Sequence, residues 1–334
     1  MGKLKTFFSR FSLSTVKRFF HNVNLAHKES GKSRIILFVD MVYCMFTYWI
    51  GHMDYVTFGF AYIGKEKRKT FMTMDDNIAL VRRLNDRSAY SLLDDKMLFN
   101  KTFRQYLGRT FIDLRDGIDG FRQFCLDKTC FFAKQLQSFG GLGVEKIRLE
   151  GQDIDALYAR LMENKMYLAE EAIVQHPTMD LLCDKSVNTL RITTIVSDRG
   201  NANCVYALVR AGNGKNDVDN VTSGGMYTLL SADGTITHPM FCDKAMAYYT
   251  QHPLSGQPFI GFRIPFFREA VELCQQAALV EPKMRYIGWD VAITPAGPVL
   301  VEGNNLPGYD MCQNHRFHDD GCGLKAAFER AINN

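Results

Sequence analysis

The strongest constraint on the fold is the segment from Arg285 to Gly308, which reads RYIGWDVAITPAGPVLVEGNNLPG. Two apolar runs flank a turn-rich pentapeptide at 294–298, a pattern that predicts a β-hairpin. If the hairpin is symmetric about the central residue of that pentapeptide, Asp290 lies opposite Glu302. Because side chains alternate between the faces of a strand, Asn304 shares the face of Glu302. The segment therefore predicts two carboxylates and an amide on one surface of a sheet.

Asp290 and Glu302 interrupt strands that otherwise consist mainly of Ile, Val, Ala and Leu. Directly opposed residues have Cβ atoms about 5 Å apart, and two carboxylates at that range repel each other unless they share a cation. Hard divalent ions such as Mg²⁺ bind carboxylate oxygens together with substrate phosphates, and a pair of metals about 4 Å apart would also fit. The alternative is an exposed hairpin end with solvated acids. The apolar surroundings favour the metal site.

A second feature is a lysine followed by a glycine-rich loop. The predicted strand Thr129 to Lys134 ends in the lysine, and the loop from Ser138 to Gly143 begins four residues later. Glycines let backbone N–H groups approach phosphate oxygens, and the lysine adds a compact positive charge. The loop lacks the spacing of a Walker loop or of a dinucleotide-binding fingerprint. A glycine-rich turn beside an exposed lysine is the alternative interpretation.

Two further segments place polar groups beside apolar runs. Arg191 stands among apolar neighbours in the sequence SVNTLRI, at 186–192. An arginine in that position either pairs with a core acid or presents its planar fork to a phosphate or a carboxylate. The polar, glycine-ended loop at 219–225 follows the strand that holds Arg210. That loop is a candidate ligand contact or simply a turn.

The order of the predicted elements indicates the fold class. From about Leu92, short β-branched or aromatic runs alternate with helical patterns, without a regular βαβ rhythm. This favours an α+β fold over a doubly wound sheet. The candidate strands are Thr129–Lys134, Tyr167–Ala172, Leu190–Ser197, Asn203–Val209, Gly288–Thr294 and Gly297–Glu302, and the candidate helices are Lys96–Leu107, Ile154–Glu163 and Arg268–Leu279.

Charge is unevenly distributed along the chain. Residues 1–33 carry seven Lys or Arg against one Glu, a net +6, so the rest of a chain of net charge +4 carries −2. A nucleic-acid-binding domain needs a basic stripe on its folded surface, so this class is excluded for the body of the protein. Within residues 1–23, apolar residues recur at helical spacing between cations. Such a basic amphipathic helix can lie on an anionic membrane surface or dock on the protein's own body.

The stretch from Ile35 to Ile50 is the most apolar of the chain. It is 16 residues long and contains Asp40, whereas a membrane-spanning helix needs about 20 apolar residues. We therefore expect a buried helix.

Cysteine usage and the N-terminal composition indicate the compartment. The nine cysteines include no C-x-x-C pair, which argues against a zinc site and favours a reducing compartment. The N-terminus lacks the pattern of a secretory signal. We expect a cytoplasmic protein that can lie on the inner face of the membrane.

Taken in order, these motifs resemble the ATP-grasp superfamily. They are Lys96 in its Asp-Asp-Lys run, Lys134 with the glycine loop, Glu170-Glu171-Ala172-Ile173, Asn188-Thr189-Leu190-Arg191, Asp219-Asn220 with Ser223-Gly224-Gly225, and Asp290 with Glu302 and Asn304. The sequences SVNTLRI, YIGWDVAITPAGPVLVEGNN and HPLSGQPFIGFRIP resemble the branch called sugar-transfer associated ATP-grasp. The resemblance covers about residues 35–315 and implies two α+β subdomains that hold ATP between them.

Together with the charge pattern of the N-terminus, the resemblance implies a division of the chain into four parts. Residues 1–33 form the basic amphipathic segment, and residues 34–90 form an N-terminal helical region. Residues 91–178 form an ATP-grasp subdomain with a glycine-rich lid, and residues 179–334 form the subdomain with the metal site.

Roles for individual residues follow from the resemblance. ATP would be bound by Lys96, Lys134, the lid residues Ser138, Gly140, Gly141 and Gly143, and the hinge strand Glu170, Glu171, Ala172 and Ile173. Mg²⁺ would be held by Asp290, Glu302 and Asn304. The transferring phosphoryl group would be stabilised by Lys134, Arg191 and Asn220, and the substrate would be bound by Asn188, Arg210, Ser223, Gly224, Gly225 and Asn305.

The implied activity is an ATP-dependent, ADP-forming ligation of a carboxylate to an amine through an acyl phosphate. The substrates would be an amino acid or a sugar acid and an amino sugar, in surface-polysaccharide biosynthesis. Two alternatives stay open. One is an ATP-grasp kinase that phosphorylates a hydroxyl group, and the other is a non-catalytic, membrane-associated scaffold that binds nucleotide.

Overall fold

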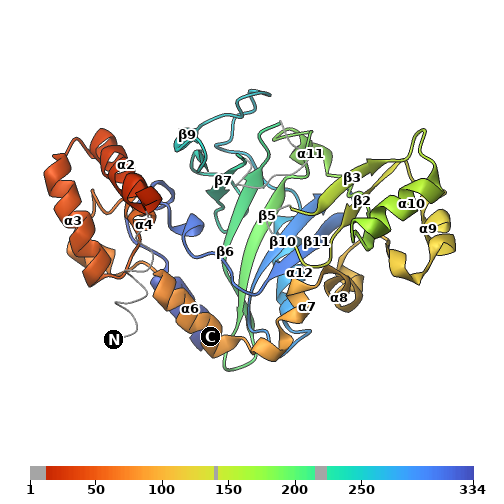
Figure 1. Ribbon diagram of the computed structural model, residues 1–334. Coiled ribbons are helices and arrows are strands. Elements are labelled where there is room, and N and C mark those ends of the chain that lie inside the picture. Colours follow the sequence, from red (N-terminus) through yellow and green to blue (C-terminus); the bar gives the residue numbers. More distant parts are fainter. Residues whose placement is uncertain (1–12, 139–141, 215–223) are drawn as a thin grey trace. The chain divides into compact units, whose positions relative to one another are not determined.

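The computed structural model describes residues 13–138, 142–214 and 224–334, which form two compact units (Figure 1). The first unit comprises residues up to Ala79 together with Gly308–Ala327. The second comprises Leu80–Pro307 together with Phe328–Asn334. The helical unit thus includes a C-terminal segment that the sequence-based division placed in the subdomain of the metal site.

The first unit is helical, as expected for the N-terminal region. Its elements are α2 (Leu13–Ser30), α3 (Arg34–Thr47), α4 (His52–Thr57), α5 (Lys65–Arg68), the first part of α6 (Met74–Leu84), the short 3-10 helices η5 (Met311–Gln313) and η6 (His315–Phe317), and the first residues of α13 (Lys325–Asn333). Buried aromatic rings fill its centre, where Phe58 stacks on Phe71 and Phe60 packs edge-on against both Tyr55 and Phe71. The buried Arg68 guanidinium forms two hydrogen bonds with the carboxylate of Asp40.

The helix expected in the stretch from Ile35 to Ile50 is present as α3, but the prediction that it is buried is wrong. Only one side of the helix is covered, through Leu37, Met41 and Cys44. On the other side Ile35 is 77% exposed and Val39 is 60% exposed. An apolar composition around a whole helix normally indicates burial on all sides, whereas among the described residues this helix has neighbours on one side only. No helix in the described ranges combines the length and apolarity needed to cross a bilayer.

The second unit contains two antiparallel sheets and has the expected α+β class. The smaller sheet has the strand order β1 (Phe111–Asp113), β4 (Leu168–Glu171), β2 (Cys130–Lys134) and β3 (Val144–Arg148). Helices α9 (Ile118–Cys125) and α10 (Ile154–Glu163) lie on one face of this sheet (Figure 1). Apolar side chains of both helices and of β2, β3 and β4 form one buried cluster there.

The larger sheet has seven strands in the order β11 (Gly297–Asn304), β10 (Tyr286–Thr294), β5 (Thr189–Val196), β6 (Ala202–Ala211), β7 (Met226–Leu229), β8 (Met240–Cys242) and β9 (Ala247–Tyr249). Helix α12 (Phe267–Ala278) packs against the strands at the centre and at the β11 edge. Two short helices, α7 (Ser91–Asp94) and α8 (Lys96–Thr102), contact β11. The remaining short elements are η1 (Arg87–Ala89), η2 (Arg104–Tyr106), η3 (Leu114–Asp116) and α11 (Pro177–Asp180).

The predicted hairpin is formed by β10 and β11, and Asp290 does lie opposite Glu302. The route to this register differs from the expected one. The turn has two residues, since Thr294 pairs with Gly297, and the register shifts next to Asp290 so that Val301 has no opposite residue. We expected a symmetric five-residue turn, and the structure has a two-residue turn with a one-residue bulge. Both geometries place the same two carboxylates opposite each other. Bulges redirect side chains beside functional sites.

Candidate active site

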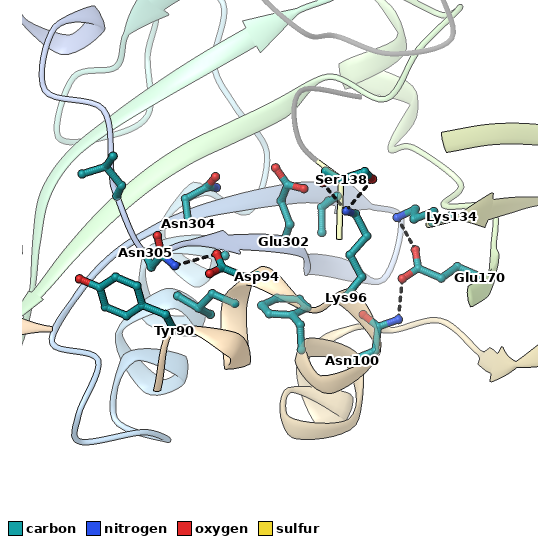
Figure 2. A pocket seen from close by; sticks show the side chains of 15 residues that line it. Tyr90, Asp94, Lys96, Asn100, Lys134, Ser138, Glu170, Glu302, Asn304 and Asn305 are labelled. Carbon is teal, nitrogen blue, oxygen red and sulfur yellow. Dashed lines mark hydrogen bonds and ion pairs between the residues drawn. The ribbon is translucent and has the colours of Figure 1, made fainter. Parts of the chain in front are cut away.

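A pocket of about 420 Å³ lies in the second unit, between the α7–α8 segment, the end of β11 and the strands β2 and β4 (Figure 2). Binding sites for small molecules in proteins have volumes of roughly 300–1,000 Å³. Seven of the predicted site residues line this pocket: Lys96, Lys134, Ser138, Glu170, Glu302, Asn304 and Asn305. They come from four separate stretches of sequence, so the fold brings together a large part of the predicted constellation.

The first turn of α8 fixes one side of the pocket. The Asp95 side chain caps the helix by accepting hydrogen bonds from the N–H groups of Met97 and Leu98. Lys96 is therefore the first helical residue, and its Nζ donates to the carbonyl oxygen of Ser138 at 2.5 Å. Its backbone N–H donates to the carbonyl of Leu136. Helix α8 thus holds the start of the glycine loop.

Burial in the pocket wall lowers the pKa of Lys96, although the Glu302 carboxylate acts in the opposite direction. Removal from water disfavours the charged form of an amine, and a nearby negative charge restores it. The arrival of polyanionic phosphates would favour the charged form further.

Glu170 is the centre of a buried polar cluster at the other end of the pocket. Its carboxylate accepts hydrogen bonds from Lys134 Nζ and Asn100 Nδ2, each at 2.5 Å. Arg109 completes the cluster with two longer contacts of 3.4 Å. Burial alone would raise the pKa of Glu170, but the charges of Arg109 and Lys134 outweigh it and hold the pKa well below its usual value.

Arg109 also joins the two sheets of the second unit. Its Nη1 donates to the carbonyl oxygen of Leu300 at 2.6 Å, and its Nη2 contacts the carbonyl oxygen of Val301 at 3.3 Å. Leu300 is the last paired residue before the register shift and Val301 is the unpaired one, directly before Glu302. One buried guanidinium therefore connects Glu170 of the smaller sheet to the backbone that positions Glu302 in the larger one.

A row of charged side chains crosses the larger sheet beside the pocket. Glu302 on β11 lies opposite Asp290 on β10, which lies opposite Arg191 on β5. Arg191 donates to Asp290 through Nε at 2.5 Å and through Nη2 at 3.1 Å. Arg210 Nη2 on β6 lies 2.8 Å from Oδ2 of Asp290, the oxygen that Arg191 Nη2 also contacts. Of the two outcomes that the sequence left open for Arg191, pairing with a core acid is the one observed.

The pKa values of the two carboxylates in this row are shifted in opposite directions. Burial would raise the pKa of Asp290, but the charges of Arg191 and Arg210 prevail and lower it. The pKa of Glu302 is raised, first by desolvation within the pocket and then by repulsion from Asp290. Glu302 is the carboxylate of this pair that lines the pocket. Strongly shifted pKa values of this kind are common at functional sites.

Two of the three predicted magnesium ligands have oxygen atoms that can reach a metal ion in the pocket. Glu302 and Asn304 both offer oxygen atoms to the pocket, whereas both oxygens of Asp290 are engaged by guanidinium groups. Within the described residues, no group of three His, Cys, Asp or Glu side chains is placed to hold a metal ion alone. Mg²⁺ commonly binds one or two carboxylates and completes its shell with water and substrate phosphates. The residues therefore suit an ion that arrives with a phosphorylated ligand.

Asn305 and Gly303 shape the floor of the pocket. The Asn305 amide donates to the carboxylate of Asp94 at 2.7 Å, and burial raises the pKa of Asp94. A Cβ atom at Gly303 would lie 2.9 Å from the Leu93 side chain and 3.2 Å from the Phe99 ring. The glycine thus permits the α7–α8 segment to pack closely on β11.

Several predicted residues lie elsewhere. Asn188 is fully buried, and its amide donates to the carbonyl oxygens of Met179 and Cys183 and accepts from the N–H of Gly212. It joins three backbone segments and offers no surface to a substrate, contrary to the role that the resemblance implied. Arg210, also predicted to bind substrate, is buried and engaged by Asp290 and Thr189.

The remaining predicted residues do not line the pocket. Glu171 accepts hydrogen bonds from the N–H and hydroxyl of Thr110. Neither Ala172 nor Ile173 contributes to the lining, and Gly224 and Gly225 lie before β7. Gly143 has a positive φ and closes the loop next to Gln135, whose side chain leaves no space for a Cβ atom. Four predicted residues, Gly140, Gly141, Asn220 and Ser223, lie outside the described residues.

Asn100 and Arg109 belong to the site but were not predicted from the sequence. Asn100 follows Lys96 by four residues in a predicted helix, so helical spacing placed both on one face and could have indicated it. Arg109 stands in a short connection after the helix, and nothing in its local sequence indicates that it joins two sheets.

The sequence profile described as sugar-transfer associated ATP-grasp matches residues 144–316, just over half of the chain. The protein belongs to this family. The matched range contains Asp290, Glu302 and Asn304, while Lys96 and Lys134 precede it. Among curated proteins, none matches this ATP-grasp chain.

Three solved structures illustrate its similarity to known proteins. The ATP-grasp ligase PsnB in complex with a minimal precursor is 13% identical, with a TM-score of 0.43 over 75% of this chain and 64% of that one. D-alanyl-alanine synthetase A from Vibrio cholerae is 12% identical, with a TM-score of 0.42 over 72% and 64%. The D-alanine-D-alanine ligase from Coxiella burnetii is 10% identical, with a TM-score of 0.38 over 72% and 54%. The chain thus spans less than two thirds of the length of each.

Proposed function

We propose that the pocket binds Mg·ATP and that the protein is an ADP-forming carboxylate–amine ligase. The observation that carries this proposal is the convergence of two lysines with the oxygen donors of Glu302 and Asn304 in one pocket, in a chain of an ATP-grasp family. Cations and carboxylate oxygens in one cavity suit a triphosphate together with its metal ion, whereas a neutral ligand would leave both sets of charges unused.

Lys96 and Lys134 are the proposed phosphate contacts. Lys96 is engaged by Ser138 and Lys134 by Glu170. Each ammonium carries three donor hydrogens, so a phosphate oxygen can be added to these contacts. The backbone N–H groups of the glycine loop, with Gly140 and Gly141, would complete the phosphate site in the manner of other glycine-rich loops.

Glu302 and Asn304 are the proposed magnesium ligands, and Asp290 is their charged neighbour. A bound Mg²⁺ supplies neutralisation of the phosphate charge that develops during transfer. The ion pairs of Asp290 with Arg191 and Arg210 leave Asp290 as a supporting residue, and a direct contact with the ion would require one guanidinium to turn away. Arg191, 15% exposed at its side chain, is the proposed contact for the transferring phosphoryl group.

The proposed reaction has two steps. A substrate carboxylate oxygen attacks the γ-phosphorus of ATP, which forms an acyl phosphate and releases ADP. An amine then attacks the acyl carbon, releases inorganic phosphate and loses a proton to the surroundings. Phosphorylation is needed because the oxide of a free carboxylate is a poor leaving group. The protein positions the reactants, stabilises the charge and excludes water that would hydrolyse the acyl phosphate.

The substrate classes follow from the sugar-transfer association of the family. We propose an amino acid or sugar acid as the carboxylate and an amino sugar as the amine, in the assembly of a surface polysaccharide on the cytoplasmic side of the membrane.

The test is a screen of carboxylate and amine pairs for phosphate release, read together with the mass of the coupled product. Release that depends on both substrates and yields an amide supports the proposal. ATP consumption without an amine, with a stable phosphorylated alcohol, would identify a kinase. A nucleotide-induced increase in stability without turnover would identify a binding scaffold, and a ligand at 100 times its Kd should add about 2.7 kcal/mol.

A further inference from the structure

One face of helix α3 exposes a continuous set of large apolar side chains. Ile35, Ile36, Phe38, Val39 and Tyr43 are between 39% and 77% exposed. Their spacing of three and four residues places them on one side of the helix. Phe20 of α2 extends this surface, because its ring stacks on that of Phe38 at a centroid distance of 5.9 Å and is itself 53% exposed. We call these six residues the α3 face.

The α3 face contains no charged side chain. The single acid of the helix, Asp40, is paired with Arg68 and also accepts a hydrogen bond from the hydroxyl of Tyr55. Its charge is therefore neutralised within the first unit. Soluble proteins seldom expose several large apolar side chains side by side unless that surface has a binding partner.

Cations lie at both ends of the α3 face. Lys32 and Arg34 are exposed and directly precede it, and Lys65 Nζ lies 5.6 Å from the centroid of the Tyr43 ring. Residues 13–69 contain nine Lys or Arg against four Asp or Glu, a net charge of +5. Apolar and aromatic side chains bordered by cations form the combination that binds the interface of an anionic bilayer.

We propose that the α3 face docks on an anionic phospholipid surface, with α3 lying in the plane of the interface. At 1.5 Å per residue its 14 residues extend about 21 Å, too short for a hydrocarbon core of about 30 Å. Tyr43 and Trp49, each 41% exposed, have the amphipathic rings that concentrate at headgroup level. The sequence indicated membrane contact through residues 1–23 alone. This site is independent of the proposed ligase activity.

The two tryptophans of the chain offer a selective probe of docking. Trp49 is partly exposed beside the end of α3, whereas Trp289 is completely buried in the core of the second unit. We expect the tryptophan emission of the full-length protein to shift to shorter wavelength with vesicles of phosphatidylcholine and phosphatidylserine. The shift should vanish in Trp49→Phe and should be much smaller with phosphatidylcholine alone. Added salt should weaken it, because screening reduces the attraction of cations to the surface.

The decisive variant carries Ile35→Glu and Val39→Glu, two exposed positions one turn apart on the α3 face. We expect at least about a tenfold loss of vesicle affinity in co-sedimentation, because the change removes two apolar contacts and adds two negative charges. The matched control is Leu126→Glu in the second unit, which is 76% exposed and should bind as the unaltered protein does. An unchanged thermal midpoint in both variants would show that the fold is retained.

Three outcomes would overturn the proposal. The first is normal vesicle binding by the double variant together with loss of binding when residues 1–12 are deleted, which would assign the contact to that segment. The second is an unaltered protein that sediments as a dimer and does not bind vesicles, while the double variant is a monomer, which would make the α3 face a contact between copies. The third is equal loss of binding in the Leu126→Glu control.

Discussion

Two glutamates line the same pocket and differ in how their charge is compensated. Glu170 is surrounded by Lys134, Asn100 and Arg109, and these contacts keep it ionised. The strongest charged influence on Glu302 is another carboxylate, that of Asp290, and its pKa is raised. Cationic side chains thus contact Glu170 directly at one end of the pocket, whereas at the other end Glu302 faces another carboxylate, whose own oxygens are engaged by Arg191 and Arg210.

The difference indicates what each end does. A buried carboxylate with several cationic partners is a structural element, because removing a partner would leave an uncompensated charge in the interior. A carboxylate that repels its neighbour and still faces a cavity is stabilised when a cation enters. Glu170 and its partners therefore have a structural role in the pocket wall, and Glu302 marks the proposed position of the metal.

The largest expected effect comes from Glu302→Gln, which keeps the size of the side chain and removes its charge. We expect ADP release to fall by at least about a hundredfold, because a magnesium ligand is lost where phosphoryl charge develops. The assay is ADP release at saturating Mg·ATP with the substrate pair found in the screen. Glu163→Gln, at the exposed end of α10, is the matched control. Unchanged turnover in Glu302→Gln would remove the metal-site assignment.

Lys134→Ala tests the other end of the pocket. We expect nucleotide affinity to fall by roughly tenfold to a hundredfold, because charge-assisted hydrogen bonds contribute about 1.5–3 kcal/mol. The thermal midpoint should fall as well, since Glu170 loses one of its cations. Isothermal titration with ADP and a thermal scan measure the two effects separately.

The double variant Lys134→Ala with Glu170→Gln separates the two roles of the lysine. It should recover part of the lost stability, because the uncompensated carboxylate is gone, but it should not recover nucleotide affinity. Near-normal affinity in either variant would show that Lys134 is only a structural partner of Glu170.

The β10–β11 hairpin beside the pocket was predicted well from the sequence. The opposition of Asp290 and Glu302 was predicted from a turn symmetric about Ala296, and the folded hairpin reaches the same pair through a two-residue turn and a one-residue bulge that offset each other. The short turn and the bulge changed the details of the register without separating the pair. Lys96 and Lys134 were found as individual motifs, and their convergence in one pocket is a property of the folded chain.

The sequence could not predict interactions that depend on packing between distant elements. Arg109 has no local signature, because its partners Glu170 and Leu300 lie far along the chain. The engagement of Asp290 by two arginines also depends on the strand order β11-β10-β5-β6. The α3 face shows the same limit, since apolar composition indicated burial and only the folded unit shows which side is covered.

The pH dependence of stability should distinguish the two glutamates by sign. The pKa of Glu170 is lowered in the folded state, so its stabilisation is complete above the unfolded-state pKa and is lost as the pH falls through the folded-state pKa. The pKa of Glu302 is raised, so its ionisation destabilises the ligand-free protein as the pH rises from the usual glutamate range toward neutrality.

Thermal scans of the two Gln variants across acidic to neutral pH measure this difference. Glu170→Gln should lower the midpoint at neutral pH, with a deficit that shrinks on acidification. Glu302→Gln should raise the midpoint slightly at neutral pH, with a gain that disappears in acid. If the thermal midpoints of the two variants changed with pH in the same way, the different roles assigned to Glu170 and Glu302 would be wrong.

The smallest expected effect concerns Arg109, which connects the two ends of the pocket. Arg109→Lys keeps the charge beside Glu170 but cannot reach the Leu300 carbonyl with the same planar fork. We expect a severalfold fall in kcat with little change in nucleotide affinity, because Glu302 is displaced while the lysine contacts remain. If Arg109 positions Glu302 through the bulge, the variant should have almost no further effect on turnover in the Glu302→Gln background. Equal fold-changes in both backgrounds would mean that the guanidinium acts only on Glu170.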